Sequence, residues 1–326
     1  MNSFALKAAL DEAWKYQFLT YPNPAVGAAV IVKNRLFVAA HKKAGGPHAE
    51  VNVLWESYKA FHKTPDLKTS HEIHEYLIKN HNGFFNEANV FVTLEPCSHI
   101  GKTPSCANLL SILKPKRVII GWLDPITEHS GGIEILKNAG IEVNVLNDKR
   151  CYDLIEPFIK WQKKFIFFKL AQSFNGAVTG GYISSESSLN WVHQVRDKID
   201  LLVIGGNSVR IDRPTLDSRR VKGKSPDVLI YSKQKEFDKT IPLFNVPNRK
   251  VFIEESLDKL ENYKFIMIEG GERLYNEIKN LVDWKVFIVT TKLFDRINYK
   301  SEDIFEILHT LRNDDLIVFG RSNAKI

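Results

Sequence analysis

Two cysteines, one histidine and one glutamate are the residues whose types and spacing most favour chemistry in this sequence. His48 and Glu50 stand in AGGPHAEVNVL, and Cys97 and Cys106 stand in TLEPCSHIGKTPSCANLL. Zinc prefers imidazole and thiolate ligands in tetrahedral geometry, and catalytic sites leave one position open for water. One histidine and two cysteines supply three ligands, and a nearby carboxylate can move protons to and from that water. The pattern predicts a catalytic zinc site with Glu50 as proton shuttle.

The local context places these side chains where loops and strands lead into helices. Pro47 puts His48 at the start of an expected helix and Glu50 within its first turn. Both can therefore face one pocket, although residues two apart on a regular helix do not. Cys97 follows a proline at the end of an expected strand, and Cys106 begins the next helix. A thiolate at a helix N-terminus is stabilised by the helix dipole, so two metal-binding cysteines are favoured over a disulfide or plain packing.

The remaining cysteine and histidine motifs predict less. Cys151 lies in an apparent connecting helix, where a buried or spare thiol is expected rather than a fourth ligand. His71 and His74 form H-E-x-H, one residue short of the H-E-x-x-H of zinc proteases, so we expect an ordinary solvated helix there. Three cysteines in 326 residues do not make a disulfide framework.

Bulk composition limits the class of protein. The 45 basic and 38 acidic residues give a formal net charge of +7. This mild excess fits a solvated surface or, as a sharper alternative, attraction for a small phosphorylated substrate or cofactor. No basic block is long enough for a nucleic-acid arm, and no apolar run has the length of a signal peptide or a membrane span. We therefore expect a cytoplasmic protein with no nucleic-acid or membrane partner.

Short apolar runs alternate with helical patterns along the chain, which is typical of α/β layers around a central sheet. In the first half we expect strands at 28–32, 35–40, 89–94, 117–122 and 141–146, and helices near 3–18, 48–61, 105–113 and 131–139. A connecting helix from about residue 147 leads to the further strand-like runs FIFFKLAQS, DLLVIGG, DVLIYS, KVFIEE, FIMIEGG, KVFIVTT and DLIVFG. The length and this break predict two domains, 1–146 and 147–326.

Two of these runs end in Gly-Gly before a helix-like segment, in VIGGNSVR and MIEGGERLYNEI. Glycines at the end of a strand let backbone N–H groups approach phosphate oxygens. A tight structural turn explains Gly-Gly alone equally well, so the two motifs by themselves leave both readings open.

The motifs together resemble a known family. H-x-E followed by Pro-Cys and a later Cys is the signature of zinc-dependent nucleobase deaminases. The long spacing C-SHIGKTPS-C, with PNPAVG and AGGPHAEV before it and GWLDP, KLAQSFNG, GGNSVRIDRPTLDSR and IEGGERL after it, resembles the bifunctional deaminase/reductase of riboflavin biosynthesis. The resemblance covers almost the whole chain, and such a set of blocks in this order is highly specific.

For residues 1–146 the resemblance implies a cytidine-deaminase-like α/β/α domain. It would hydrolyse the 2-amino group of 2,5-diamino-6-(5-phosphoribosylamino)pyrimidin-4-one, with Glu50 as the catalytic residue. One zinc ion per chain would be bound by His48, Cys97 and Cys106. The positions that would contact the substrate are Asn23, His41 and His99. By its chemistry alone, Asn23 suits either a pyrimidine edge or the cap of a local turn.

For residues 147–326 the resemblance implies a dihydrofolate-reductase-like α/β domain that uses NADPH to reduce the ribosyl chain to a ribityl chain. The cofactor would contact Ala171, Ser173, Gly176, Tyr182, Ser208, Asp212, Gly270 and Gly271. The substrate would contact Arg196, Leu216, Arg219 and Glu269. Arginine suits phosphate because its planar fork binds two oxygens, although a surface ion pair is the default for an arginine taken alone. A homo-oligomer, dimer or tetramer, and a phosphorylated pyrimidine as small-molecule partner are also implied.

The sequence departs from the family in several places. Asn175 stands where the family has Asp, Tyr182 stands where Trp is usual in the shortened segment TGGY, and residues 56–88 form a longer insertion. These departures keep open a deaminase-only enzyme with a degenerate reductase domain. A nucleic-acid-modifying deaminase would need a basic stripe with exposed aromatics. A non-enzymatic zinc-stabilised binding protein would need a fourth ligand, for which the sequence offers no obvious candidate.

Overall fold

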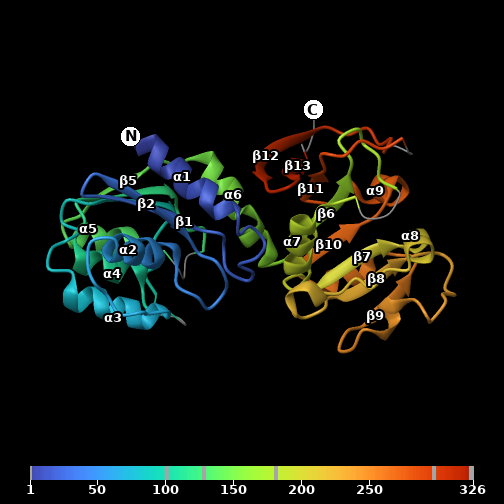
Figure 1. Cartoon of the computed structure of the whole chain (residues 1–326), viewed down its shortest axis with the longest axis horizontal. Helices are drawn as coiled ribbons and strands as arrows, with labels where there is room; N and C mark the ends of the chain where they lie inside the picture. Colours follow the sequence, from blue (N-terminus) through green and yellow to red (C-terminus); the bar gives the residue numbers. More distant parts are fainter. Residues whose placement is uncertain (1, 100–102, 127–129, 180–182, 296–298, 323–326) are drawn as a thin grey trace. The chain divides into compact units, whose positions relative to one another are not determined.

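The computed structural model describes residues 2–99, 103–126, 130–179, 183–295 and 299–322 (Figure 1). The chain separates into two compact units, residues 1–159 and 160–326. The observed boundary falls near the end of the connecting helix, whereas the sequence places the boundary before that helix, after residue 146. Among the described residues, no helix is long and apolar enough to cross a membrane. Tyr182, expected near the cofactor, lies outside the described residues.

The first unit is a five-stranded sheet covered by helices (Figure 1). Its strands follow the order β2-β1-β3-β4-β5, with β1 antiparallel to both neighbours and β3, β4 and β5 parallel. Its elements are α1 (Asn2–Trp14), β1 (Gly27–Val32), β2 (Arg35–Ala40), α2 (Ala49–Lys59), α3 (Ser70–Asn80), β3 (Asn89–Leu94), α4 (Cys106–Leu113), β4 (Arg117–Trp122), α5 (Gly132–Asn138), β5 (Glu142–Val145) and α6 (Lys149–Trp161), the last of which ends in the second unit.

Alternation along the strands decides which helix covers which face, because successive side chains point to opposite sides. Val30, Val92 and Ile120 join the apolar core that α2, α4 and α5 complete. On the opposite face, a side chain at Gly27 would meet the backbone of α1, with a Cβ only 1.9 Å from the Ala9 oxygen. The thiol of Cys151 packs against Gly121 in the same way, 2.4 Å from the position of a Cβ. The sheet is therefore the middle of three layers, and Cys151 is a buried packing residue.

The second unit is built on an eight-stranded sheet of order β12-β13-β11-β6-β10-β7-β8-β9. Strands β11, β6, β10, β7, β8 and β9 run parallel, whereas β13 and β12 add antiparallel pairs at one edge. Its elements are β6 (Phe165–Gln172), α7 (Glu186–Arg196), β7 (Leu201–Gly205), α8 (Gly206–Asp212), β8 (Asp227–Tyr231), β9 (Val251–Glu254), β10 (Phe265–Glu269), α9 (Glu272–Ile278), β11 (Trp284–Val289), β12 (Phe305–Arg312) and β13 (Leu316–Ser322), with short 3₁₀ turns η1 (Arg219–Val221), η2 (Pro242–Asn245) and η3 (Asp258–Asn262).

The central strands β6, β10 and β7 consist mainly of buried Phe, Ile, Leu and Val residues, as expected where both faces of a parallel sheet are covered. Because they are parallel, their carboxyl ends meet at one edge, and loops that follow them can share a ligand. The expected strands all occur. Strand β12 was not predicted, because its half-exposed, mixed sequence FEILHTLR lacks a continuous apolar run.

Helix α3 corrects one expectation. His71 is exposed and lies 3.2 Å from Glu75, as in a solvated helix, but only 3% of His74 is exposed. The helix begins with a capping box in which Thr69 and Glu72 satisfy each other's backbone N–H groups. Its inner face, with Ile73, His74 and Leu77, is buried, so the expectation of an ordinary solvated helix is wrong for His74.

Candidate functional site

The side chains of His48, Cys97 and Cys106 converge in the first unit. Their ligand atoms all lie within 4.8 Å of one another. His48 Nδ1 is 3.7 Å from Cys97 Sγ and 3.4 Å from Cys106 Sγ. Both thiols are free, so the structure contains no disulfide between them. One nitrogen and two sulfurs at this separation can surround a single metal ion.

Helix starts hold the three donors in place. His48 is the N-cap residue of α2, with extended backbone angles, and Cys106 is the first residue of α4. Ser105 caps α4: its Oγ accepts the Asn108 N–H at 3.2 Å and donates to the Cys97 carbonyl at 2.8 Å. The Cys106 N–H points at Cys97 Sγ over 3.5 Å. The capping of α4 and the placement of both sulfurs are therefore one structural feature.

Thr103 fixes the orientation of the His48 ring, and the sequence analysis missed it. Thr103 Oγ1 lies 3.2 Å from His48 Nε2, on the side of the ring away from the sulfurs. If Nε2 carries the proton and donates to this hydroxyl, Nδ1 keeps its lone pair for a metal. Outer hydrogen bonds of this kind commonly select the tautomer of a ligating histidine.

Glu50 lies beside the donors in the first turn of α2, with only 4% of its surface exposed. Burial raises the pKa of Glu50 to about 7, although the charge of His48 opposes the rise. A hydrogen bond also connects its carboxyl to Cys106. A carboxyl group with a pKa near neutrality can both accept and return a proton, which is what a shuttle needs.

The pKa values of the two thiols are shifted in opposite directions. The hydrogen bond with Cys106 lowers the pKa of Cys97 to about 4, and the same bond together with burial raises the pKa of Cys106 well above its ordinary value. Burial lowers the pKa of His48, but the hydrogen bond with Cys97 and the charge of Glu50 outweigh burial and raise it. The Cys97 side of the cluster thus favours a thiolate. A bound divalent cation would favour loss of the second thiol proton as well.

Asn23 and His41 lie next to the metal donors. His41 Nδ1 donates to the Pro47 carbonyl at 3.0 Å, which leaves Nε2 to accept from the Asn23 amide at 3.2 Å. Burial lowers the pKa of His41 to about 4, so the ring is neutral. The rings of His41 and His48 meet edge to face with centroids 5.4 Å apart. His99 is exposed, two residues beyond Cys97.

Glu95, in the LEPC motif, is a second residue that the sequence analysis missed. Its buried carboxylate accepts backbone N–H groups of Gly131 at 3.1 Å and of Asp124 and Ile133 at 3.3 Å. These bonds hold the start of α5 against the Pro-Cys turn. Gly132 is required at this contact, because a Cβ there would lie 2.0 Å from the Pro96 oxygen.

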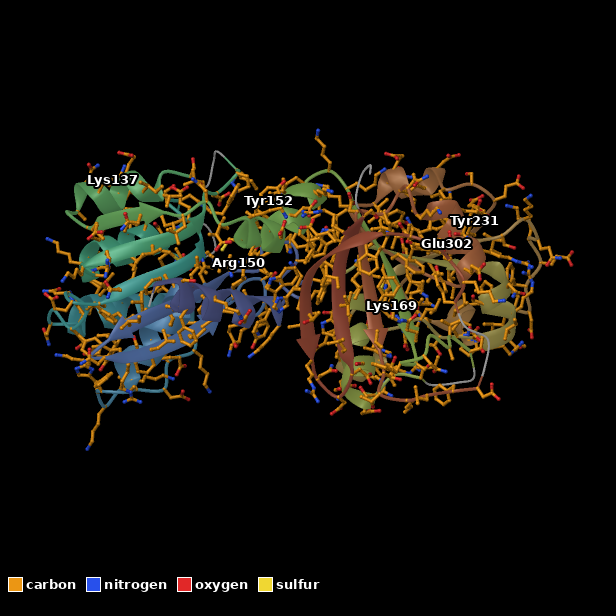
Figure 2. The ribbon with its side chains drawn as sticks, turned by 90° about the horizontal axis from the view of Figure 1, so that it is seen from above. Lys137, Arg150, Tyr152, Lys169, Tyr231 and Glu302 are labelled. Atoms are coloured by element: carbon orange, nitrogen blue, oxygen red, sulfur yellow. The ribbon has the colours of Figure 1, made fainter. Side chains whose placement is uncertain are left out.

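The second cluster lies at the carboxyl ends of β6, β10 and β7. Glu269, the last residue of β10, contacts Arg196 Nη2 at 3.1 Å and Lys169 Nζ at 3.7 Å. Lys169 (labelled in Figure 2) lies directly beside Glu269 in the register of β6 and β10. Burial would raise the pKa of Glu269, but the charges of Arg196 and Lys169 outweigh it and lower the pKa. Lys169 was not predicted, because nothing in FIFFKLAQS marks its charge as a site residue.

The turn after β6 is built by Ser173. Its Oγ donates to Asn175 Oδ1 at 2.7 Å and accepts the Ala177 N–H at 2.8 Å, and Gly176 adopts a left-handed φ of 84°. The Asn175 amide donates to the Phe294 carbonyl at 2.8 Å. An aspartate could not make this last bond, so the departure from the family residue at 175 has a local structural role. Ala171 is half-buried near the end of β6.

Residues 213–219 form a loop that Arg249 holds from beneath. The Arg249 guanidinium donates to the carbonyls of Leu216 and Thr215 at 2.7 Å and of Leu243 at 2.5 Å. Leu216 is buried with a φ of 56°, a left-handed conformation that is costly for leucine. Two of the bonds stabilise this backbone and the third ties it to Leu243 in η2, so Arg249 positions the loop that carries two predicted substrate contacts, Leu216 and Arg219.

Positive charge gathers beside this loop. His193 on α7 is 4% exposed, and its Nδ1 has no hydrogen-bond partner within the described part of the chain. Burial, together with the charges of Arg196 and Arg219, lowers the pKa of His193 to about 4. Arg219 is exposed and contacts Asp217 at 2.5 Å. A local excess of arginine suits a phosphate group.

The other predicted cofactor contacts follow the ends of β7 and β10. Ser208 and Asp212 lie on α8, half-buried and exposed respectively, and Gly270 and Gly271 follow Glu269. A Cβ at Gly270 would lie 2.7 Å from Leu274, whereas the space beside Gly271 is open. Gly270, Gly271 and the first turn of α8 with Ser208 therefore lie at the shared carboxyl edge, whereas Asp212 is at the far end of α8.

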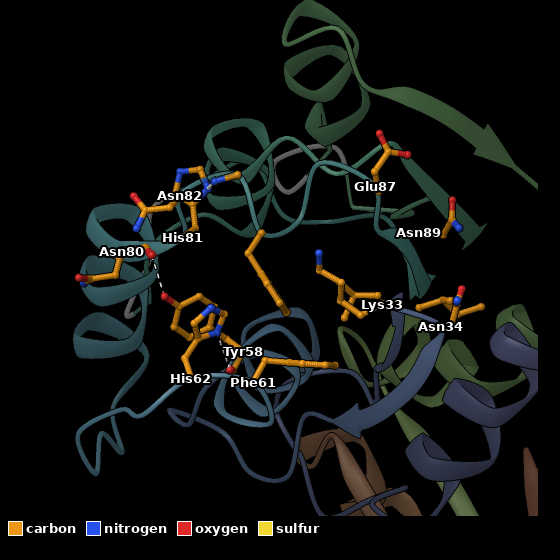
Figure 3. Close-up of a pocket in the computed structure, with 14 residues that line it drawn as sticks. Lys33, Asn34, Tyr58, Phe61, His62, Asn80, His81, Asn82, Glu87 and Asn89 are labelled. Atoms are coloured by element: carbon orange, nitrogen blue, oxygen red, sulfur yellow. Dashed lines mark hydrogen bonds between the residues drawn. The ribbon is translucent and has the colours of Figure 1, made fainter.

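A cavity of about 710 Å³ belongs to neither cluster (Figure 3). Lys33 and Asn34 of the β1–β2 turn line one side of it, and Tyr58, Phe61 and His62 line the other. It contains none of the predicted site residues.

Comparison with known proteins assigns the two halves of the chain to two different domain families. Residues 1–122 match the cytidine and deoxycytidylate deaminase zinc-binding region, and residues 164–320 match the RibD C-terminal domain. The riboflavin biosynthesis protein RibD of Aquifex aeolicus is 30% identical over 299 residues, covering 86% of this chain and 77% of that protein. RibD of Synechocystis sp. is 30% identical over 253 residues, covering 74% of this chain but only 62% of that protein.

Solved structures show the same fold. The diaminohydroxyphosphoribosylaminopyrimidine deaminase/5-amino-6-(5-phosphoribosylamino)uracil reductase of Thermotoga maritima has a TM-score of 0.66 and 24% identity, with 98% of each chain covered. RibD of Acinetobacter baumannii has a TM-score of 0.63 and 21% identity, with 99% of each chain covered. The expected fold class, a cytidine-deaminase-like domain followed by a dihydrofolate-reductase-like domain, is confirmed.

Proposed function

The chain belongs to the RibD family of bifunctional deaminase/reductases of riboflavin biosynthesis, and on that premise we propose a specific pair of reactions for it. The first unit hydrolyses the 2-amino group of 2,5-diamino-6-(5-phosphoribosylamino)pyrimidin-4-one. The second unit reduces the ribosyl chain of the deaminated product to a ribityl chain with NADPH. The observation that carries the proposal is the convergence of three ligand atoms within 4.8 Å beside the buried carboxyl of Glu50.

The donor set of the first unit fits zinc. His48, Cys97 and Cys106 would hold one ion per chain and leave a tetrahedral position open. Zinc, when bound, supplies a Lewis acid that makes water nucleophilic at neutral pH. Glu50 accepts a proton from the attacking water and returns one to the leaving amine. The balance is the substrate plus water giving the 2-oxo product plus ammonia.

Asn23 and His41 orient the pyrimidine in this proposal. The His41 ring donates from Nδ1 to the Pro47 carbonyl and accepts the Asn23 amide at Nε2, so both of its nitrogens are engaged and it fixes the orientation of Asn23. The carboxamide oxygen and the second N–H of Asn23 can then accept from and donate to the polar edge of a pyrimidine. His99 contributes from the loop after Cys97.

Reduction of the ribosyl group breaks its C1′–O4′ bond, adds hydride to C1′ and requires a proton on O4′. NADPH, when bound, supplies the hydride. Lys169 holds a proton at Nζ within the buried cluster, and burial lowers its pKa, which favours release of that proton. Glu269 stays ionised and can accept hydrogen bonds from sugar hydroxyls, while Arg196 and Arg219 attract the phosphate. Of the predicted cofactor contacts, Ala171 and Ser173 lie at the end of β6, and Gly270 and Gly271 directly follow β10.

The wider setting is part of the same proposal. We infer a cytoplasmic homo-oligomer that acts on a small phosphorylated pyrimidine and requires neither nucleic acid nor membrane. The mild positive charge of the chain, +7, agrees with an anionic substrate.

A mass-resolved product assay tests both halves. The zinc-loaded chain is incubated with the diaminopyrimidinone phosphoribosyl substrate with and without NADPH. We expect the deaminated compound alone without NADPH, and the deaminated and reduced compound with it. Deamination that stalls in the presence of NADPH would contradict the proposed second reaction. Absence of deamination would contradict the proposed substrate.

A further inference from the structure

Lys285, on strand β11 of the second unit, is a deeply buried lysine that has no part in the proposed reactions. Only 1% of its side chain is exposed. Its neighbour across the sheet on β6 is Phe168, and its ammonium lies 5.8 Å and 5.6 Å from the ring centres of Tyr275 and Phe305. Lysine is almost never buried this completely unless its charge is paired, so its place among aromatic rings requires a specific partner.

That partner is Asp303, on the segment that leads into β12. One oxygen of its carboxylate, Oδ2, accepts hydrogen bonds from Lys285 Nζ and from the Tyr275 hydroxyl on α9. Burial alone would raise the pKa of Asp303, but the bonds from Lys285 and Tyr275 outweigh burial and lower it. A single carboxylate thus joins a strand, a helix and the segment before β12.

The segment that carries Asp303 reaches the turn after β6. The Tyr299 N–H donates to the Gly176 carbonyl at 3.0 Å, and the rings of Tyr299 and Tyr275 meet edge to face with centroids 5.8 Å apart. Gly176 is one of the predicted cofactor contacts. Because Asp303 lies only four residues beyond Tyr299, the ion pair with Lys285 limits how far the backbone that holds this turn can move.

The same segment is bonded to the first turns of α9. Ser301 Oγ donates to Asn276 Oδ1 at 2.8 Å, beside the bond between Tyr275 and Asp303. The Tyr275 N–H in turn donates to the carbonyl of Gly271, the N-cap residue of α9, at 3.1 Å. Gly271 is also a predicted cofactor contact. One short segment therefore connects two turns that come from different strands and are predicted to meet the same cofactor.

We propose that Lys285 and Asp303 are positioning residues of the cofactor site, whose ion pair holds residues 299–303 so that the turn with Gly176 and the start of α9 keep their separation. The inference rests on the proposed function, because it assumes that these two turns bind NADPH. The pair acts through the backbone and is assigned no contact with the cofactor. Turns that are ordered before binding lose less conformational freedom when a ligand arrives, so such an anchor favours affinity.

The test uses variants of the full chain that separate the ion pair from general stability. Asp303→Asn keeps the shape of the side chain but leaves the Lys285 ammonium buried without a counter-charge. The double variant Lys285→Met/Asp303→Leu replaces the pair by apolar side chains, a change that commonly restores stability. It still lacks the bonds that attach the segment to β11 and α9. Glu306→Gln is the matched control, because Glu306 lies close by in the sequence and pairs with Arg321 at 2.7 Å between β12 and β13.

Two measurements report on the turns. Amide hydrogen exchange of the cofactor-free protein, followed in peptides that contain Gly176 and Gly271, shows how firmly each turn is held. Fluorescence titration gives the Kd for NADPH, and NADPH oxidation with separately supplied deaminated intermediate gives KM and kcat. Thermal unfolding of each variant measures stability independently of the cofactor.

We expect Asp303→Asn to unfold at a lower temperature, and the double variant to recover most of that loss. In both, exchange in the two peptides should be faster, and the Kd and KM for NADPH should rise by about tenfold with a smaller change in kcat, since a displaced positioning group can cost up to about a hundredfold. Glu306→Gln should behave like the unmodified chain in all of these measurements.

The outcomes separate the two proposals. If the unmodified chain does not bind NADPH, the proposed function of the second unit fails, and the positioning role fails with it. If it binds NADPH and folded Asp303→Asn shows the same Kd and the same exchange, only the positioning role is wrong. Recovery of both stability and NADPH affinity in the double variant would also overturn it, because the pair would then contribute packing alone.

A third variant covers the case in which Asp303→Asn and the double variant do not fold. Tyr275→Phe keeps the ring and removes only the bond from α9 to Asp303. We expect faster exchange in the peptide with Gly271 and a weaker affinity for NADPH. Unchanged exchange and an unchanged Kd in Tyr275→Phe would contradict the proposal.

Discussion

Glu50 and Glu269 are both enclosed by protein, yet their carboxyl groups are shifted in opposite directions. Burial raises the pKa of Glu50 to about 7, in surroundings made of an imidazole and two thiols. For Glu269 burial acts in the same sense, but Arg196 and Lys169 lie within 3.1 Å and 3.7 Å and lower the pKa. Neighbouring charge, more than burial, separates a carboxyl group that can exchange protons from one that stays ionised.

The same difference separates the two sites as a whole. The first cluster gathers donors whose charge a metal ion would balance, so its order depends on that ion. The second cluster pairs the single carboxylate of Glu269 with two cations, Lys169 on the neighbouring strand and Arg196 on α7, so its order does not depend on a metal ion. The first site should therefore respond to metal removal and the second to loss of a single charged side chain.

The largest expected effect comes from Cys97→Ser. Replacing a thiolate ligand should remove stoichiometric zinc and reduce deamination to background, because the remaining donors cannot complete the site. Metal content and ammonia release measure the effect. Reduction of the separately supplied deaminated intermediate should continue. Retention of one zinc per chain would contradict the proposed ligand set.

Glu50→Gln should separate metal binding from proton transfer. The amide keeps the shape of the side chain but cannot accept and return a proton, so we expect deamination to fall by about 10²–10⁴-fold. Zinc content should remain that of the unmodified chain. The assay is ammonia release at saturating substrate, and near-normal turnover would rule out the proposed shuttle.

Glu269→Gln tests the ion-paired cluster of the second unit. Removing one partner of a buried ion pair leaves Arg196 and Lys169 uncompensated, so the free energy of unfolding of the second unit should fall by about 3–5 kcal/mol. NADPH oxidation should be lost while deamination persists. The matched control is Glu254→Gln, whose side chain is 37% exposed and lies 3.6 Å from Lys259. For such an exposed pair we expect a change below about 1 kcal/mol, and equal losses in the two variants would contradict the comparison.

Arg249→Met should loosen the loop that carries Leu216. Three hydrogen bonds from a charged donor are lost, and each is worth about 1.5–3 kcal/mol when it is made well. We expect a higher KM for the phosphorylated reductase substrate and a loss of about 2–3 kcal/mol in unfolding free energy, since part of the loss is relieved by water. Arg210→Met is the control, because Arg210 also contacts two carbonyls, but at 3.4 Å on the surface. An unchanged KM in Arg249→Met would argue against a positioning role.

The smallest expected effect is a pH dependence from His193. Its folded pKa, lowered to about 4 by burial and by Arg196 and Arg219, lies below the value of about 6.5 for an unfolded histidine. The unfolded chain then binds more protons between these values, so this contribution to stability is present above pH 6.5 and is lost as the pH falls toward 4. Unfolding midpoints of the unmodified chain and of His193→Gln, measured across this window, should converge at low pH. Parallel curves would show that His193 does not contribute.

The sequence predicted the first site far better than the second. Histidine and cysteine in this spacing have few other uses, so His48, Cys97 and Cys106 could be chosen from their types, and the structure brings them together. Thr103 and Glu95 were missed because hydroxyl and carboxyl groups that only orient other residues carry no such mark. His74 was misjudged although Ile73 and Leu77, four residues apart, mark the buried face of the helix on which His74 also lies.

In the second unit the decisive contacts arise from strand register. Lys169 meets Glu269 because β6 and β10 become parallel neighbours, and the order of strands in the sheet cannot be deduced from either segment. Arg249 is similar, since its three acceptors are backbone carbonyls of two separate segments, whose positions the sequence alone does not determine. The strands themselves, with the exception of β12, were predicted from their apolar runs.

The separation of these contacts along the chain has a consequence for synthesis. Cys97 and Cys106 follow His48 by 49 and 58 residues, so all three metal donors lie within the first unit. The Arg196–Glu269 pair spans 73 residues and closes only when β10 has been added between β6 and β7. A nascent chain that has left the ribosome as far as residue 159 already contains every donor for zinc, whereas Lys169, Arg196 and Glu269 have yet to emerge. Metal capture can therefore precede completion of the reductase. Strand β6 then stays unpaired for longest, because its neighbours β10 and β11 are made late, while β7 can pair with β8 earlier.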